Sequence, residues 1–141
     1  LGYDLHNGEY GVYCGDQDGQ IFLSQWYYDT EVYGSMYPGT FPAAIDQQFK
    51  DNIDLANWLF NNLENYPGYT WDELQDALWI LLDPDYQLTK LMNNPPTPTT
   101  NDMVADAQAY GEGFLPLPGG WAAIIFWNGE DIQLVLAFVD P

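Results

Sequence analysis

The sequence predicts an α+β fold, in which strands from both ends of the chain form an antiparallel sheet or sandwich around a central helical segment. Aromatic and β-branched residues dominate the N-terminal third and residues 121–141, which favours strands there. Between them, apolar residues recur at intervals of three and four, the period of a helix with one buried face. The order strands, helices, strands is typical of α+β proteins.

The N-terminal strands are expected in EYGVYC (9–14) and QIFLSQWYYDTEVY (20–33). A turn at Asp18-Gly19 separates them, and the glycine and proline residues of 34–42 predict a loop after them. At the other end, WAAIIFW (121–127), NGED and IQLVLAFVDP (132–141) predict a hairpin. Its turn is expected at Asn128-Gly129, with positive φ angles at both residues.

Three helices are expected between these strands. The first covers 51–63, and its buried face is predicted to hold Ile53, Ala56, Leu59, Phe60 and Leu63. The second covers 70–83, where Thr70 and Glu73 have the spacing of a capping box and Pro84 ends the helix.

The proline-rich stretch 93–100 is expected to be a loop that leads to a third, shorter helix at 101–110. Gly111 follows that helix directly, so it is predicted to serve as the C-terminal cap.

The length of 141 residues predicts a single domain over 1–141. The net charge of −19 excludes the basic surface that nucleic acids or anionic membranes need. The longest apolar run, Trp121 to Trp127, is far shorter than a membrane span of about 20 residues. The chain begins at Leu1 without methionine, so we expect a mature extracellular protein that is secreted or displayed at the cell surface.

Cys14 is the only cysteine, which excludes a disulfide within the chain and a zinc site of several cysteines. A buried inert thiol, a bond to another chain and a reactive sulfur all remain open. His6 is the only histidine, so histidine-based catalytic triads are excluded as well.

Two further binding sites are considered. Asp16 and Asp18 in DQDG resemble the start of a Ca²⁺ loop, but the third ligand and the terminal glutamate are missing, so a turn is the alternative. The 11 Tyr and 6 Trp residues fit either a core or a carbohydrate-binding surface.

Three short motifs stand in a recognisable order: YCGD (13–16), LQDALW (74–79) and IQLVL (132–136). Together they resemble the thioester domains of bacterial surface adhesins and related secreted proteins. Those domains carry an aromatic-cysteine motif, a helix with glutamine and tryptophan, and a glutamine in a late strand. Two residues depart from the family pattern: Leu74 stands where threonine is usual, and Gly15 stands where an apolar residue is usual.

The resemblance implies an internal thioester between Cys14 and Gln133. It also implies that Tyr13 and Trp79 exclude water from the bond and that Gln75 orients the reacting groups. Such a bond reacts with a primary amine of a partner and does not turn over, so no enzyme activity is expected. Without the resemblance, these five residues would be ordinary core or surface positions.

The expected function is therefore covalent attachment to an amine-bearing host or matrix protein. Lys50 and Lys90 are the only lysines and no arginine is present, which limits reaction of the thioester with its own chain. Both lysines are expected to lie away from Cys14. The alternatives are a structural subunit of an extracellular filament or surface coat, built from copies of this chain, and a carbohydrate-binding module.

Overall fold

The structure is a computed structural model, and it describes residues 11–15, 27–84, 86, 95–129 and 134–139. In chain order its main elements are β1 (Val12–Cys14), β2 (Glu31–Gly34), α1 (Gln47–Asn61), α2 (Trp71–Leu82), α4 (Pro98–Tyr110), β3 (Ala122–Trp127) and β4 (Val135–Val139). Two short 3₁₀ helices, Pro38–Thr40 and Leu63–Asn65, flank α1. The α+β prediction is confirmed.

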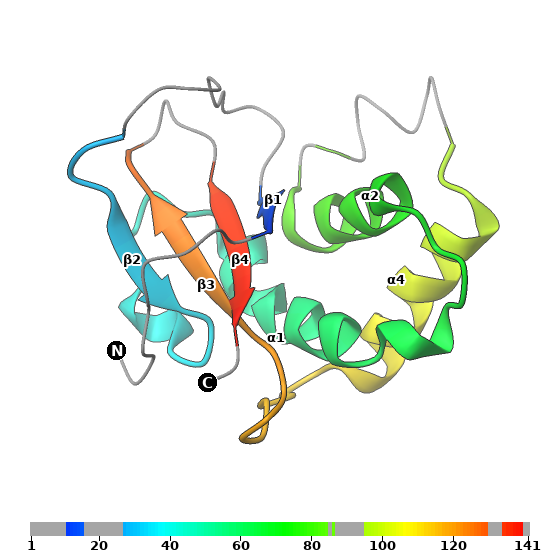
Figure 1. The fold of residues 1–141 in the computed structure, drawn as a ribbon. Coiled ribbons are helices and arrows are strands. Elements are labelled where there is room, and N and C mark those ends of the chain that lie inside the picture. Colours follow the sequence, from blue (N-terminus) through cyan, green and yellow to red (C-terminus); the bar gives the residue numbers. More distant parts are fainter. Residues whose placement is uncertain (1–10, 16–26, 85, 87–94, 130–133, 140–141) are drawn as a thin grey trace.

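The strands form one antiparallel sheet in the order β1-β4-β3-β2. The C-terminal strands β3 and β4 thus form the centre of the sheet and the N-terminal strands β1 and β2 its two edges, so strands from both ends of the chain share one sheet, as expected. The sheet occupies one side of the molecule, α1 runs beneath it, and α2 and α4 lie on the far side of α1 from β2 (Figure 1). The described residues contain this one sheet and not a second one that would complete a sandwich.

The connection between β3 and β4 is longer than the expected turn NGED (128–131), because β4 begins at Val135 and not at Ile132. Phe126 pairs with Val135, so the eight residues 127–134 lie between these partners. Gly129 has a φ of 93°, whereas positive φ does not extend to Asn128. The turn residues were therefore recognised, but the strand register was not, because long-range pairing decides it.

The capping box at the start of α2 is confirmed. The Thr70 hydroxyl accepts a hydrogen bond from the Glu73 amide at 3.3 Å, and the Glu73 carboxylate accepts one from the Thr70 amide at 2.9 Å. The helix ends at Leu82, two residues before Pro84, as expected from the missing amide hydrogen of proline.

The other two helices begin earlier than the sequence indicated. α1 starts at Gln47 instead of 51. α4 starts at Pro98 instead of 101, because Thr97 caps it by accepting from the Thr100 amide at 3.2 Å and Pro98 fits the first turn. Residues 98–100 of the proline-rich stretch therefore belong to α4 and not to the expected loop, because proline is favourable in the first turn of a helix.

Gly111 does cap α4, but its backbone is right-handed, with φ −91°. The reason for glycine is space. A Cβ at Gly111 would lie 2.6 Å from the Ala107 carbonyl oxygen and 3.1 Å from the Leu55 Cα. Helix α4 therefore ends at a point where its backbone lies directly against Leu55 of α1.

The core lies between the sheet and the three long helices. Its fully buried side chains include Ile53, Leu59, Leu74, Leu78, Leu81, Met103, Ile125 and Leu136. All five apolar positions expected on the first helix face the core: Ile53, Ala56 and Leu59 belong to it, and Phe60 and Leu63 are partly buried and pack against it. Leu63 lies beyond the end of α1, in the 3₁₀ helix Leu63–Asn65. Among the described helices, none combines the length and the apolar character that a membrane crossing requires.

Candidate functional site

Gln75 binds the backbone of Cys14 at two points. The Cys14 amide donates to Gln75 Oε1 at 2.9 Å, and Gln75 Nε2 donates to the Cys14 carbonyl oxygen at 2.8 Å. Strand β1 is at the edge of the sheet, so one row of its backbone groups faces away from β4. The amide of Gln75 takes the place that a further strand would occupy, and it joins α2 to β1.

The other side of β1 is paired with β4. Cys14 lies opposite Val135, and the Gly15 amide donates to the Leu134 carbonyl oxygen at 2.6 Å. Gln133 itself lies outside the described residues, but it precedes Leu134 directly in the sequence. Tyr13 and Cys14 of the YCGD motif thus pair with Leu136 and Val135 of the IQLVL motif, more than a hundred residues away in the chain.

Gly15 is required by the closeness of this pairing. A Cβ at this position would lie 2.3 Å from Leu134 Cδ2, 3.2 Å from the Leu134 carbonyl oxygen and 3.2 Å from Phe49 Cε2. A side chain at position 15 would push β1 away from Leu134. The departure from the family pattern at Gly15 therefore has a local steric reason.

Trp79 lies one helical turn after Gln75, on the same face of α2. Its ring packs against Tyr86 at a centroid distance of 5.3 Å. The Tyr86 hydroxyl donates to Asp76 Oδ1 at 2.8 Å, which fastens residue 86 to the middle of α2. The role expected for Trp79 in excluding water from the thioester stays a prediction.

Tyr13 points toward the helices. Its ring lies 5.5 Å from that of Phe60 on α1 and 5.3 Å from that of Trp71 at the start of α2. Neighbouring residues of a strand project to opposite faces, so the Cys14 side chain leaves β1 on the other face. The expected role of Tyr13 at the thioester also stays a prediction. Its side chain lines a pocket between the sheet and the helices.

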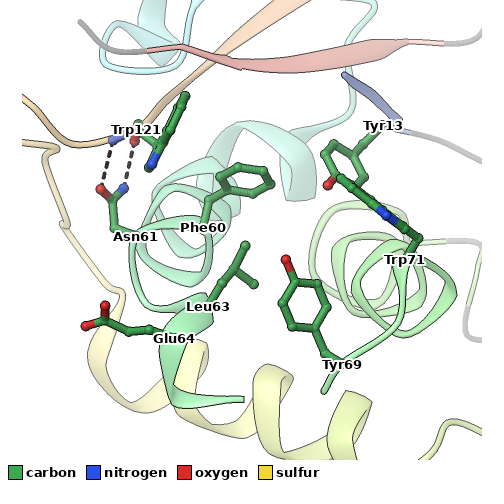
Figure 2. Close-up of a pocket in the computed structure, with 8 residues that line it drawn as sticks. All are labelled: Tyr13, Phe60, Asn61, Leu63, Glu64, Tyr69, Trp71 and Trp121. Atoms are coloured by element: carbon green, nitrogen blue, oxygen red, sulfur yellow. Dashed lines mark hydrogen bonds between the residues drawn. The ribbon is translucent and has the colours of Figure 1, made fainter. Parts of the chain in front are cut away.

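This pocket has a volume of about 390 Å³ and is here called the aromatic pocket (Figure 2). It is lined by Tyr13, Phe60, Asn61, Leu63, Glu64, Tyr69, Trp71 and Trp121. The side-chain amide of Asn61 holds one wall in place, because it donates to the Trp121 carbonyl oxygen at 2.7 Å and accepts from the Trp121 amide at 2.8 Å. The pocket thus lies between α1, the start of α2 and the start of β3.

The Tyr13 hydroxyl is buried and makes no hydrogen bond. Burial raises the pKa of Tyr13 above its ordinary value of 10, and the nearby Tyr69 phenol raises this pKa further. The hydroxyl is therefore a neutral donor and acceptor throughout the physiological pH range. Among the described pocket residues it is the buried side-chain polar atom that lacks a partner in the protein.

The remaining residues singled out in the sequence are placed only in part. Asp16, Asp18 and Lys90 lie outside the described residues, so the Ca²⁺ loop and the position of that lysine stay predictions. Within the described ranges, no group of three or more acidic, cysteine or histidine side chains is arranged to hold a metal ion. The Lys50 ammonium donates to the Ala43 carbonyl oxygen at 3.5 Å.

The sequence analysis missed the aromatic pocket. Its walls come from four separate stretches of the chain, so no local motif marks it. One signal was available: Trp71 occupies the first position of a capped helix, directly after Tyr69-Thr70, where a large aromatic residue is not needed for the helix.

Comparison of the chain with protein-family models, with curated proteins and with solved structures found no match.

Proposed function

We propose that the protein attaches covalently to amine-bearing partners outside the cell through an internal thioester between Cys14 and Gln133. The pairing of β1 with β4 is the observation that carries this proposal. Cys14 lies opposite Val135, and Gln133 comes two residues before Val135 in the sequence. An uninterrupted extended strand would direct residues 133 and 135 to the same face, which is the face of Cys14.

Gln75 supports the proposal as a positioning residue. Its two hydrogen bonds fix the Cys14 backbone from the side opposite β4. A nucleophile held between two rigid elements reacts with a neighbouring acyl group as if that group were at very high concentration. We expect Gln75 to act through the placement of Cys14 and not through contact with the reacting atoms.

The proposed reaction has two steps. The Cys14 sulfur attacks the side-chain amide carbon of Gln133; a C–S bond forms, the C–N bond breaks, and ammonia leaves with the thiol proton. A primary amine of the partner then attacks the same carbon; a C–N bond forms, the C–S bond breaks, and the Cys14 thiol is restored. Each molecule reacts once, so the protein is proposed to be a reagent and not an enzyme.

The charge of the chain is consistent with this use. A net charge of −19 attracts cationic partners such as lysine-rich surfaces. The chain's own amines are limited to Lys50, Lys90 and the N-terminus, which keeps competing reactions within the chain few.

The mass of the intact protein tests the proposal. We expect the native chain to be lighter than its sequence mass by one ammonia and to gain one methylamine when that amine is added. Cys14→Ala and Gln133→Ala should each abolish both changes. Gln48→Ala is the matched control, because Gln48 also donates from a helix to a backbone carbonyl, at 3.2 Å, but that carbonyl belongs to Leu81 and not to Cys14. A native mass equal to the sequence mass, with a thiol that alkylates readily, would contradict the proposal.

The alternative is a structural subunit of an extracellular filament or coat. Strand β2 forms the second edge of the sheet, and addition of a strand from a neighbouring copy would extend the sheet there. Because a charge of −19 opposes assembly, filaments are expected to form better with Ca²⁺ or at low pH. Electron microscopy at neutral pH with and without Ca²⁺, on the full chain and on a chain lacking residues 1–8, tests this. A monomer under all these conditions would exclude it.

A further inference from the structure

The aromatic pocket has no role in the proposed thioester, because the Tyr13 and Cys14 side chains leave β1 on opposite faces. Two large aromatic residues stand at its mouth with much of their surface in water: 66% of Trp71 and 47% of Trp121. Tryptophan is costly to leave in water and is enriched where proteins bind ligands. The pocket therefore needs a functional explanation of its own.

The interior of the pocket combines aromatic rings with a polar group that has no partner. Figure 2 shows the hydroxyls of Tyr13 and Tyr69 directed toward the space bounded by Phe60, Leu63 and Trp71. The Tyr13 side chain is only 4% exposed, and its hydroxyl makes no hydrogen bond. A buried hydroxyl without a partner is destabilising, and a bound ligand with a donor or acceptor at that point would supply the missing hydrogen bond.

The polar groups of the pocket favour one kind of ligand. A neutral sugar needs several donors and acceptors for its hydroxyls, but the Asn61 amide is already occupied by the backbone of Trp121 and by the Asn57 carbonyl oxygen. What remains is two phenol hydroxyls, the indole N–H groups of Trp71 and Trp121, and the carboxylate of Glu64, which is exposed at the rim. The carboxylate is the charged group among them, and its charge is negative.

Aromatic faces with a nearby carboxylate are the surroundings that proteins use for organic cations. The electron-rich ring faces attract positive charge, most strongly those of tryptophan. The described lining residues include no lysine, arginine or histidine. The charge of −19 adds a long-range attraction for cations.

We propose that the aromatic pocket binds an organic ammonium ion. The rings of Trp71, Phe60 and Tyr69 surround the cationic head, Glu64 balances its charge at the rim, and the Tyr13 oxygen accepts from its N–H or polarised C–H groups. A volume of about 390 Å³ has room for such a head group and a short alkyl chain. This binding is non-covalent and does not depend on the thioester.

The probe is tetramethylammonium chloride, which cannot form an amide, and the protein is Cys14→Ala, which cannot form a thioester. Binding is followed by the NMR signals of the tryptophan indole N–H groups, at matched ionic strength with sodium chloride. The indole signals of Trp71 and Trp121 should shift saturably. The signal of Trp58, which packs against Tyr110 elsewhere, should not.

Three comparisons decide the result. The neutral molecule of the same shape, tert-butanol, should bind at least about tenfold more weakly, as expected for the loss of the cationic charge. Trp71→Ala and Glu64→Gln should each weaken tetramethylammonium binding roughly fivefold or more. Tyr110→Ala, which removes another exposed aromatic residue, should leave it unchanged.

Equal binding of tert-butanol and tetramethylammonium would overturn the proposal, as would shifts that follow ionic strength alone. Saturable binding of glucose with no response to tetramethylammonium would overturn it in favour of a carbohydrate site. Because every measurement uses Cys14→Ala, failure here leaves the thioester proposal intact, and failure of the mass test leaves this one intact.

Discussion

The side-chain amide of Asn61 makes the same two-point contact with the backbone of Trp121 that Gln75 makes with Cys14. In both places a helix supplies the hydrogen bonds that a missing strand would have made. One helical turn before Asn61, the buried amide of Asn57 accepts from the Ala123 amide at 2.9 Å and from the Ser35 hydroxyl at 3.1 Å. Side-chain amides thus connect the helices to the ends of β1 and β3.

Replacing Gln75 should loosen the edge strand. Gln75→Ala removes two hydrogen bonds to the Cys14 backbone in a half-buried site, so we expect a loss of about 1–3 kcal/mol in the free energy of unfolding. Hydrogen exchange of the Cys14 amide should accelerate more than that of the core strand β3. Gln48→Ala is the control: Asn52 also donates to the Leu81 carbonyl, at 2.8 Å, so that carbonyl keeps a partner. If Gln75→Ala and Gln48→Ala lower the free energy of unfolding equally, then the two hydrogen bonds from Gln75 to Cys14 do not hold β1 in place.

Adding a single methyl group at Gly15 should separate β1 from β4. Gly15→Ala places a Cβ within 3.2 Å of both the Leu134 carbonyl oxygen and the Phe49 ring, and such overpacking typically costs about 1–3 kcal/mol. Chemical denaturation measures this loss. Gly39→Ala should be tolerated, because no atom lies within 4 Å of its added Cβ. If Gly15→Ala is as stable as Gly39→Ala, then β1 and β4 accommodate a Cβ at position 15, and the steric explanation for Gly15 is wrong.

Asn57 should matter more to stability than Asn61, although both bind the start of β3. Asn57 is only 1% exposed. Asn57→Ala removes the acceptor of the Ala123 amide and of the Ser35 hydroxyl inside the protein, so it should lower the free energy of unfolding by about 2–4 kcal/mol. Asn61→Ala exposes its two groups to water and should cost less. It should nevertheless weaken ligand binding to the aromatic pocket, since Trp121 loses its anchor. Thermal unfolding and the tetramethylammonium titration separate these two effects.

Stability should decrease at high pH partly through Tyr66. Burial and the hydrogen bond from its hydroxyl to Asp106 raise the pKa of Tyr66 above its ordinary value of 10. In the unfolded chain the phenol loses its proton near pH 10, whereas in the folded protein it keeps it. The stabilisation is therefore complete below pH 10 and is lost progressively as the pH rises above 10.

Tyr66→Phe tests this linkage. The variant should be less stable than the parent at pH 8, because it lacks the bond to Asp106, but its stability should decrease less steeply between pH 10 and 11. Denaturation midpoints over this range give both slopes. Parallel slopes would show that Tyr66 does not contribute to the alkaline transition.

The sequence by itself determined the kind and approximate position of most elements. The α2 capping box depends on Thr70 and Glu73, three residues apart, and the buried face of α1 depends on a repeat of three and four residues. These signals are local, so they are readable without knowing what the helix packs against. Helix starts were less certain, because Thr97-Pro98 fits a loop and a first helical turn equally well.

Tertiary structure alone decided what these elements bring together. The register that sets Cys14 opposite Val135 and Phe126 opposite Val135 comes from the packing of the whole sheet, and no turn motif specified it. The aromatic pocket combines side chains that are as far apart in the sequence as Tyr13 and Trp121. The hydrogen bonds between Gln75 and Cys14 connect residues that are 61 positions apart. Contacts of this kind leave no local pattern in the sequence. Each residue is compatible with its own helix or strand whatever its tertiary partner is, and the two partners come together only when the whole chain folds.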